Sequence, residues 1–173
     1  KPHFSRLILN IDEKNKSLTT VAKIIDYWKN NNHYKHWNLI GGGTLLDCAA
    51  FAASLCGVLH ENHPTSLLAM VDASLGSKNG VNIPPYGKNL VGSFYHPQKI
   101  IICTKWLNTL PDKEWSSGNS ECIKHALLLG DKQFIKELLP TLKNKNKKIL
   151  KKLLPTLIKV KEDIVARDPY EKT

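Results

Sequence analysis

The stretch that decides the fold is "WNLIGGGTLLDCAAFAASLCG", residues 37–57. It opens with a short apolar run of strand length, passes through three consecutive glycines and continues as a run of small and apolar residues. Glycine allows a tight turn and close backbone approach, and the run that follows suits a helix that packs closely on a sheet. A strand, a glycine turn and a helix in this order are typical of a nucleotide-binding α/β unit.

The segments on either side extend this alternation. The apolar runs "RLILNI", residues 6–11, and "KIIICT", residues 99–104, predict strands, the second of them buried. Residues 17–32 carry apolar side chains at helical spacing, and Ser17 is suited to cap that helix. We therefore expect an α/β fold with a nucleotide-binding unit over residues 1–111.

The pattern changes near Pro111. From there on we see no strand-like runs, and residues 112–173 predict helices punctuated by Pro140 and Pro155. Residues 143–161 place Ile149, Leu150, Leu153 and Leu154 at helical spacing among many lysines. This pattern predicts an amphipathic helix with a lysine-coated outer face.

The composition limits the class of protein. The 173 residues carry a net charge of +10, which raises nucleic acid as a partner. The excess lies mostly on the predicted amphipathic helix, without interleaved aromatic residues, so we expect a solvated face and no nucleic-acid partner. No apolar run approaches the roughly 18 residues of a membrane span, and the four cysteines lack CxxC spacing. We expect reduced thiols, a cytoplasmic protein and no membrane association.

Several polar groups are candidates for a site, each beside a plainer interpretation. The glycine turn at Gly42 and Gly43 could bind a phosphate at a helix N-terminus, or be an ordinary tight turn. Thr65 and Ser66 could contact a ligand, although an N-cap is the simpler interpretation. The glycine-rich loop after Asp72 carries Lys78, and further on come Lys88 and Asn89. Its lysines suit a phosphorylated substrate, with a polar surface loop as the alternative.

A second candidate group lies in "GNSECIKHALL", residues 118–128. Glu121, Lys124 and His125 are three and four residues apart and share one helix face. A surface ion pair is the common explanation of such spacing. The sharper one is a carboxylate metal ligand with a lysine beside the reacting group. The stretch "HENH", residues 60–63, lacks the spacing of a zinc site on its own.

Taken in order, these pieces resemble the 3-dehydroquinate synthase family of sugar phosphate cyclases. The resemblance covers nearly the whole chain, and its most specific block runs from "PTSLLAMVDAS" to "GKN", residues 64–89. It implies a Rossmann-like domain followed by a mostly helical domain, with the active site between them. It also implies a phosphate-eliminating lyase of the shikimate pathway to aromatic amino acids. That enzyme uses NAD and a divalent metal, usually zinc, to form 3-dehydroquinate from a seven-carbon keto acid phosphate, and a homodimer is expected.

The resemblance also implies roles for individual residues. The metal ligand is Glu121, and the residues at the substrate and nicotinamide, with catalytic roles, are Asp72, Lys78, Asn89 and Lys124. Lys78 and Lys88 are expected to converge on a doubly anionic substrate. The cofactor residues are Glu13 and Lys16 at the ribose, Gly42, Gly43 and Asp47 at the pyrophosphate turn, Thr65, Ser66 and Thr109 lining the pocket, and Lys78 and Lys88.

The chain also departs from the family pattern. The family expects about sixty residues before Lys1, and a long part after Thr173 with two histidine metal ligands. An arginine expected before Gly57 is missing, "VLHENH" replaces an apolar strand, and Ser77 replaces a glycine. Three hypotheses follow: a partial chain of a 3-dehydroquinate synthase, a sister cyclase for another phosphate, or a non-catalytic remnant that binds a nucleotide or nucleic acid.

Overall fold

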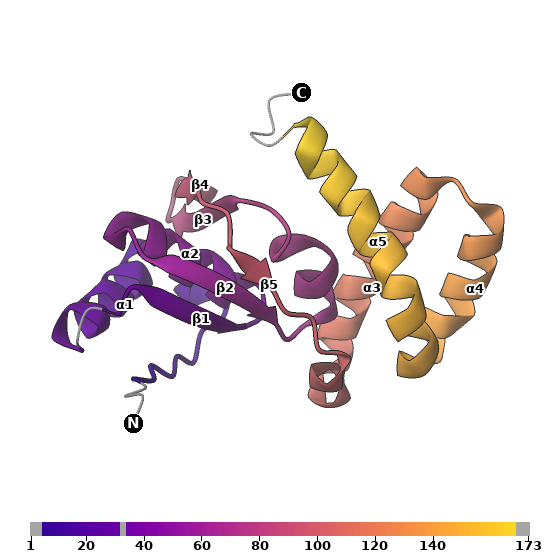
Figure 1. Ribbon diagram of the computed structural model, residues 1–173, viewed down its shortest axis with the longest axis horizontal. Coiled ribbons are helices and arrows are strands. Elements are labelled where there is room, and N and C mark those ends of the chain that lie inside the picture. The colour runs from indigo at the N-terminus through magenta and orange to yellow at the C-terminus, as the bar shows by residue number, and fades with distance from the viewer. Residues whose placement is uncertain (1–4, 32–33, 169–173) are drawn as a thin grey trace. The chain divides into compact units, whose positions relative to one another are not determined.

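The computed structural model describes residues 5–31 and 34–168 (Figure 1), and these residues form two compact units. Unit 1 contains the described residues up to Asn62 together with residues 77–99. Unit 2 contains residues 63–76 and the described residues from Ile100 onward. The chain thus crosses between the units three times, and two of the crossings fall inside short strands. The domain boundary near Pro111 stays a prediction.

Unit 1 combines helices with two small sheets. A three-stranded sheet has the order β1-β2-β5, and a two-stranded sheet pairs β3 with β4. Because β1 and β2 are neighbours and the chain joins them through α2, this connection is the crossover that parallel strands require. The elements are η1 (Glu13–Asn15), α1 (Leu18–Asn30), β1 (His36–Gly41), α2 (Gly43–Cys56), β2 (Leu59–Pro64), β3 (Lys78–Ile83), β4 (Gly87–Phe94) and β5 (Lys99–Ile100).

Helix α2 is the centre of unit 1. It contacts α1, β1 and β3, and its residues from Cys48 to Ala53 are all buried. The four alanines in that run let neighbouring backbones approach closely, which the composition of the segment predicts. Helix α1 packs on α2 through Val21 and Ile24, and the Ser17 hydroxyl accepts a hydrogen bond from the Thr20 amide, as predicted for its cap.

Three strand predictions have different outcomes. The strand before the glycine turn is confirmed as β1. Residues 6–11 form no strand in the described part of the chain, and Ile8 is 81% exposed. An apolar run becomes a strand only where a neighbour accepts its backbone hydrogen bonds, and the local pattern cannot supply one. The prediction for residues 99–104 is only partly right, because β5 is two residues long and not fully buried.

The segment that replaces the usual apolar strand still forms one. β2 alternates between more exposed and buried residues, with His60 and Asn62 facing inward. The two strands of the β3–β4 hairpin lie very close together at Gly92, because a Cβ at this position would lie 2.0 Å from the Asn79 carbonyl oxygen. Only glycine allows that approach between paired strands.

Unit 2 is a helical unit with one apolar core. The core joins Leu67, Met70 and Val71 to side chains from every long helix of the unit, including Trp115, Leu142 and Leu157. The elements are η2 (Ala69–Ala73), η3 (Thr104–Thr109), α3 (Asp112–Leu129), α4 (Lys132–Lys143) and α5 (Lys147–Arg167). The predicted change to helices after Pro111 is therefore confirmed.

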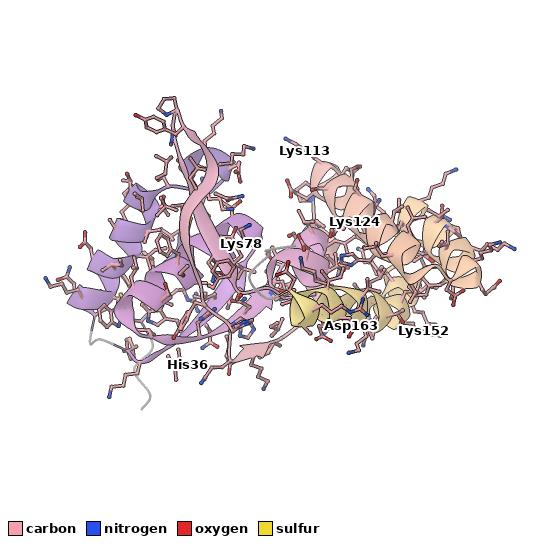
Figure 2. All side chains as sticks on the ribbon, turned by 90° about the horizontal axis from the view of Figure 1, so that it is seen from above. His36, Lys78, Lys113, Lys124, Lys152 and Asp163 are labelled. Atoms are coloured by element: carbon pink, nitrogen blue, oxygen red, sulfur yellow. The ribbon has the colours of Figure 1, made fainter. Side chains whose placement is uncertain are left out.

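The predicted amphipathic helix is confirmed as α5. Leu150, Leu153, Leu154 and Leu157 are buried. Lys159 is exposed and pairs with Asp163 at 2.7 Å on the outer side. Lys152 and Asp163 are labelled on this helix in Figure 2.

The predicted helix ends at Pro140 and Pro155 are wrong. Both prolines lie inside helices, in α4 and α5 respectively. A proline inside a helix costs roughly 3 kcal/mol. Buried leucines flank each proline, Leu138 and Leu142 in α4 and Leu154 and Leu157 in α5. Their burial offsets the local cost, so the helices continue through the prolines.

The remaining sequence-based expectations concern the thiols and membranes. All four cysteines are free; Cys48 and Cys122 are buried, while Cys56 and Cys103 are half-buried. None of the helices in the described ranges has the length and apolar character to cross a bilayer.

His60 generates a pH prediction. Its ring is fully buried 5.3 Å from the ring of Tyr95, and neither nitrogen has a hydrogen-bond partner in the described part of the chain. Burial, with a smaller effect of the nearby His36 charge, lowers the pKa of His60 from 6.5 to about 4. In the unfolded chain, His60 is therefore protonated as the pH falls below about 6.5. In the folded chain it stays neutral until the pH is near 4.

We expect the free energy of unfolding to fall as the pH is lowered through this window, by about 1.5 kcal/mol from His60 alone between about pH 6.5 and pH 5. Above that window its contribution is complete. His60→Phe should remove this part of the slope in denaturant titrations, and the exposed His96→Phe should keep it. An unchanged slope in His60→Phe would contradict the assignment.

Gly118 generates a prediction about packing. On α3, a Cβ at this position would lie 2.6 Å from the Leu67 Cβ and 2.9 Å from the Leu68 amide nitrogen. Helix propensity alone would favour alanine by about 1 kcal/mol. We expect the clash to dominate, so Gly118→Ala should lower the free energy of unfolding by about 2 kcal/mol. Ser117→Ala, on the exposed side of the same turn, should change it by less than about 0.5 kcal/mol. Equal stability of the two variants would contradict this packing.

Candidate functional site

The N-terminus of α2 is the first part of the site. Gly42 caps the helix in an extended conformation and Gly43 is its first residue, so no side chain bonds to the first-turn amides at this cap. The turn follows directly from β1, as the sequence predicts. Amides without a side-chain cap, together with the positive end of the helix dipole, suit a phosphate group.

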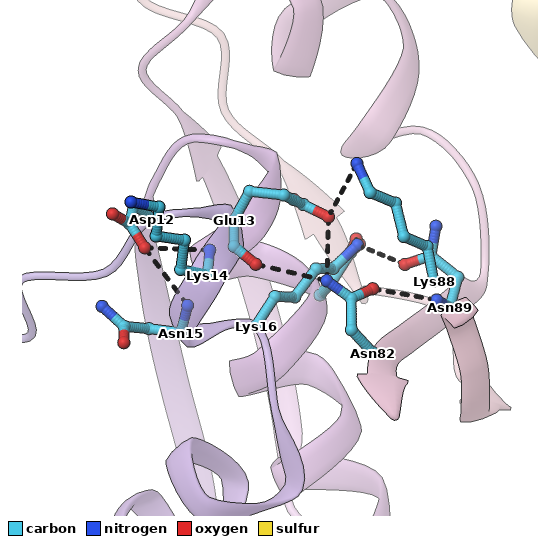
Figure 3. A network of polar contacts seen from close by, with 9 residues as sticks. Asp12, Glu13, Lys14, Asn15, Lys16, Asn82, Lys88 and Asn89 are labelled. Carbon is cyan, nitrogen blue, oxygen red and sulfur yellow. Dashed lines mark hydrogen bonds and ion pairs between the residues drawn. The ribbon is translucent and has the colours of Figure 1, made fainter. Parts of the chain in front are cut away.

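A buried lysine lies beside this helix. The Lys16 side chain is 7% exposed, and its ammonium lies 2.5 Å from the Asp47 carboxylate on α2. The same ammonium donates a hydrogen bond of 2.6 Å to the Asn89 side-chain oxygen (Figure 3). Three predicted site residues, distant in sequence, are therefore brought together within unit 1.

A second part of the same network reaches the surface (Figure 3). The Asn82 side-chain amide donates to the backbone oxygen of Glu13 at 3.2 Å and to its carboxylate at 2.9 Å. The Lys88 ammonium lies 3.8 Å from the same carboxylate, and the Lys88 side chain is 74% exposed. Glu13 and Lys88 are thus neighbours at an accessible edge of unit 1.

The expected convergence of Lys78 and Lys88 is wrong. The hairpin register places Lys78 opposite Phe94, at the far end from the turn, whereas Gly87 beside Lys88 pairs with Ile83. Six residues of strand separate Lys88 from Phe94, which corresponds to roughly 20 Å. The two lysines cannot reach one anionic group together, although each can contact a different part of an extended ligand.

In unit 2, Asp72 lies on the π-helical turn η2, which packs against α3 and α5. Such turns frequently occur at functional sites. The Asp72 carboxylate lies 2.7 Å from the ammonium of Lys161 on α5. The sequence predicts Lys161 on the lysine-coated outer face of α5, but its side chain is only 18% exposed. The missed signal is periodicity, because Lys161 follows Leu157 by one helical turn and continues its buried stripe.

Helix α3 supplies the carboxylate group predicted from spacing. One Glu121 oxygen lies 2.5 Å from the Lys124 ammonium and 2.9 Å from the His125 Nε2. His125 is fully buried, and this burial lowers its pKa despite the nearby carboxylate. Lys124 is about half exposed on the same helix (Figure 2). The three side chains share one face, as predicted.

Glu121 fits the role of a metal ligand in its chemistry. The Glu121 side chain is only 15% exposed, and its carboxylate lies next to the Lys124 ammonium and the His125 ring. Within residues 5–31 and 34–168, however, no three histidine, cysteine, aspartate or glutamate side chains are grouped to hold a metal. The described residues therefore supply one carboxylate to such a site and not a complete coordination shell.

The remaining predicted residues have ordinary local contacts. The Ser66 hydroxyl accepts a hydrogen bond of 3.3 Å from the Ala69 amide, which is the simpler N-cap interpretation. The Thr109 hydroxyl donates to the Trp106 carbonyl at 3.4 Å and is exposed. Thr65 directly precedes Ser66 and is half-buried. Their roles at a cofactor stay predictions.

The predicted site residues divide between the two units. Those in unit 1 are Glu13, Lys16, Gly42, Gly43, Asp47, Lys78, Lys88 and Asn89. Those in unit 2 are Thr65, Ser66, Asp72, Thr109, Glu121 and Lys124, to which the structure adds Lys161.

Known proteins are similar to this chain in sequence and in fold. The family model described as 3-dehydroquinate synthase N-terminal matches residues 6–117. A 3-dehydroquinate synthase of Legionella pneumophila (strain Lens) is 44% identical over 132 residues, which cover 74% of this chain and 36% of that protein. One of Campylobacter hominis is 39% identical over 163 residues, covering 92% of this chain and 46% of that protein. The chain thus spans less than half the length of these relatives.

Solved structures agree with this assignment. A 2-deoxy-scyllo-inosose synthase complexed with carbaglucose-6-phosphate, NAD+ and Co2+ is 28% identical, with a TM-score of 0.83 over 94% of this chain and 46% of that one. A 2-epi-5-epi-valiolone synthase from Streptomyces hygroscopicus subsp. jinggangensis 5008, with NAD+ and Zn2+ bound, is 22% identical and has a TM-score of 0.82, over 95% and 48% of the two chains. The second likeness concerns the fold alone. The chain belongs to the 3-dehydroquinate synthase family.

Proposed function

We propose that this chain contributes the nucleotide-binding part, and the beginning of the metal- and substrate-binding part, of a 3-dehydroquinate synthase. The reaction is the phosphate-eliminating cyclisation of a seven-carbon keto acid phosphate to 3-dehydroquinate, in the shikimate pathway. The observation that carries this proposal is the family match over residues 6–117. Curated relatives named 3-dehydroquinate synthase favour this substrate over that of a sister cyclase or a non-catalytic remnant.

The proposed cofactor is NAD, with its pyrophosphate at the N-terminus of α2. The absence of a side-chain cap at Gly42 supports this placement. When bound, NAD would accept a hydride from the substrate and later return it. Glu13 and Lys88 lie at an accessible edge of the same unit, and the proposed contacts in unit 2 are Thr65, Ser66 and Thr109. The NAD+ bound to the cyclase neighbour supports the same cofactor here.

The proposed metal is a divalent ion, usually zinc in this family, with Glu121 as one ligand. The burial of this carboxylate, whose side chain is 15% exposed, supports this role. The metal supplies a positive charge that polarises the alcohol to be oxidised. We propose that the other ligands lie outside the described residues, because no three metal-binding side chains are grouped within residues 5–31 and 34–168.

The lysines around this carboxylate have a complementary role. We propose that Lys124 and Lys161 bind the anionic groups of the substrate, because these two lysines lie on helices of unit 2 that pack against each other. Asp72 holds the Lys161 ammonium at 2.7 Å and so orients it. A cation held before the substrate arrives costs no reorganisation when negative charge develops on the leaving phosphate.

We also propose a cytoplasmic, homodimeric enzyme with a small-molecule substrate. Four free thiols suit a reducing compartment. Neither nucleic acid nor a membrane is a proposed partner, since the lysines of α5 form an outer face without interleaved aromatic residues.

Phosphate release tests the proposed reaction directly. The full-length protein should release inorganic phosphate from the seven-carbon keto acid phosphate only when NAD and a divalent metal are present. Treatment with a chelator should abolish the release, and added zinc or cobalt should restore it. Activity that survives complete metal removal would contradict the metal role, and no release under any condition would contradict the reaction.

A substitution at Glu121 tests the ligand. Glu121→Gln keeps the shape and removes the negative charge, so the full-length protein should bind the metal at least about tenfold more weakly. Metal content after gel filtration and competition with a chromogenic chelator measure the loss independently of activity. Glu114→Gln, an exposed change on the same helix, is the control and should retain the metal. Equal metal binding by the two variants would overturn the assignment.

A further inference from the structure

We propose that Asn79 is a positioning residue for Lys78, which it holds through the main chain at the open end of the β3–β4 hairpin. The inference rests on the proposed function, because the family resemblance places Lys78 at the substrate and the nicotinamide. Asn79 follows Lys78 on β3 and is not among the site residues predicted from the sequence. Its contacts, and not its place in a motif, assign the role.

The side-chain amide of Asn79 is buried and bonds to two main-chain oxygens. Asn79 is 5% exposed. Its Nδ2 donates to the Ser77 carbonyl at 2.7 Å and to the Tyr95 carbonyl at 3.0 Å. A side-chain amide has two N–H donors, so these two acceptors match its donor capacity. The amide thereby links the residue that precedes Lys78 to the residue that follows β4.

A main-chain hydrogen bond closes the same end of the hairpin. The Tyr95 amide donates to the Ser77 carbonyl at 2.7 Å. This bond lies one step beyond the last pair of the ladder, in which Lys78 is opposite Phe94. Ser77 and Asn79 are buried, whereas Lys78 between them is exposed (Figure 2). The backbone on both sides of Lys78 is thus fixed while its side chain reaches the surface.

Tyr95 anchors this closed end to the rest of unit 1. Its hydroxyl donates to the Val58 carbonyl at 3.1 Å, just before β2. Its ring lies 5.3 Å from the buried ring of His60 on β2. The hydrogen bond from Asn79 to Tyr95 therefore reaches a residue that is itself held. Lys78 is placed relative to β2 and not only relative to its own hairpin.

A fixed position matters for Lys78 because its proposed contribution is electrostatic. A cation that already lies in place needs no reorganisation when negative charge develops on the substrate. Misplacing a group at the reacting centre by about 1 Å can cost roughly 100-fold in rate. Removing the Asn79 amide leaves the Lys78 side chain intact but removes two hydrogen bonds that hold its backbone. Asn79 can therefore determine how Lys78 meets the substrate without touching the substrate itself.

A double-mutant cycle in the full-length protein tests this role. The variants are Asn79→Ala, Lys78→Gln and the two combined, with Asn79→Thr as the conservative variant that keeps one donor. Ser93→Ala is the matched control, because it removes a hydrogen bond of 2.8 Å to Ser54 from the residue opposite Asn79. For each protein we would measure the urea midpoint and the Kd for the seven-carbon keto acid phosphate. The Kd is measured by calorimetry with NAD present and the metal removed, so that no turnover occurs.

Positioning predicts that Asn79→Ala weakens substrate binding about three- to tenfold when Lys78 is present, and less than about twofold in the Lys78→Gln background. Asn79→Thr should recover part of the loss, and Ser93→Ala should change the Kd less than about twofold. A direct contact by Asn79 predicts the same loss in both backgrounds. A purely structural role predicts a lower urea midpoint with an unchanged Kd. Either of these two results would overturn the proposal.

Amide hydrogen exchange separates failure of this inference from failure of the proposed reaction. If the parent protein does not bind the substrate, the proposed function fails, but exchange still reports on the closed end of the hairpin. Asn79→Ala should raise the exchange rate of the Tyr95 amide at least about tenfold. The Asn89 amide, bonded to Asn82 at the turn end, should keep its rate. An unchanged rate at Tyr95, with or without activity, would show that Asn79 does not hold this segment and would overturn the inference.

Discussion

The close packing of α2 is the constraint on which unit 1 depends. Its central residues, Cys48 to Ala53, are buried against α1, β1 and β3, and small side chains make that approach geometrically feasible. The helix must therefore begin immediately after β1, which the glycines permit. The same helix has no side-chain cap at its first turn and brings Asp47 next to the buried Lys16. Core packing and ligand chemistry are thus provided by one helix.

Unit 2 builds its part of the site on a different constraint. A single apolar stripe along α5 binds that helix to α3 and to the π-helical turn η2. Continuing the stripe by one turn brings Lys161 to Asp72. Helix α3, which contacts both α5 and η2, carries Glu121, Lys124 and His125 on one face. Lys161 is therefore placed by the leucines of the stripe, and the proline inside α5 is accommodated because the same leucines stay buried.

Family resemblance and structure contribute different kinds of knowledge about the site. The resemblance names residues, such as Lys16, Asp72 and Asn89, from their motifs. The structure shows which partners those residues have, and a partner can change the interpretation of a role. Lys16, for example, is expected at the cofactor, and the structure pairs its ammonium with Asp47 and Asn89. Lys161 is the reverse case, a lysine interpreted as surface that faces a predicted site residue.

The sequence by itself determined the features that depend on neighbours along the chain. These include the strand, glycine turn and helix of residues 37–57, the change to helices after Pro111, the Ser17 cap and the shared face of Glu121, Lys124 and His125. Only the tertiary structure decided what depends on contacts between distant segments. Residues 6–11 found no strand partner, the hairpin register separated Lys78 from Lys88, and buried leucines carried two helices through their prolines. Local patterns specify propensity, whereas hydrogen-bond partners and buried charge pairs exist only after the chain has folded.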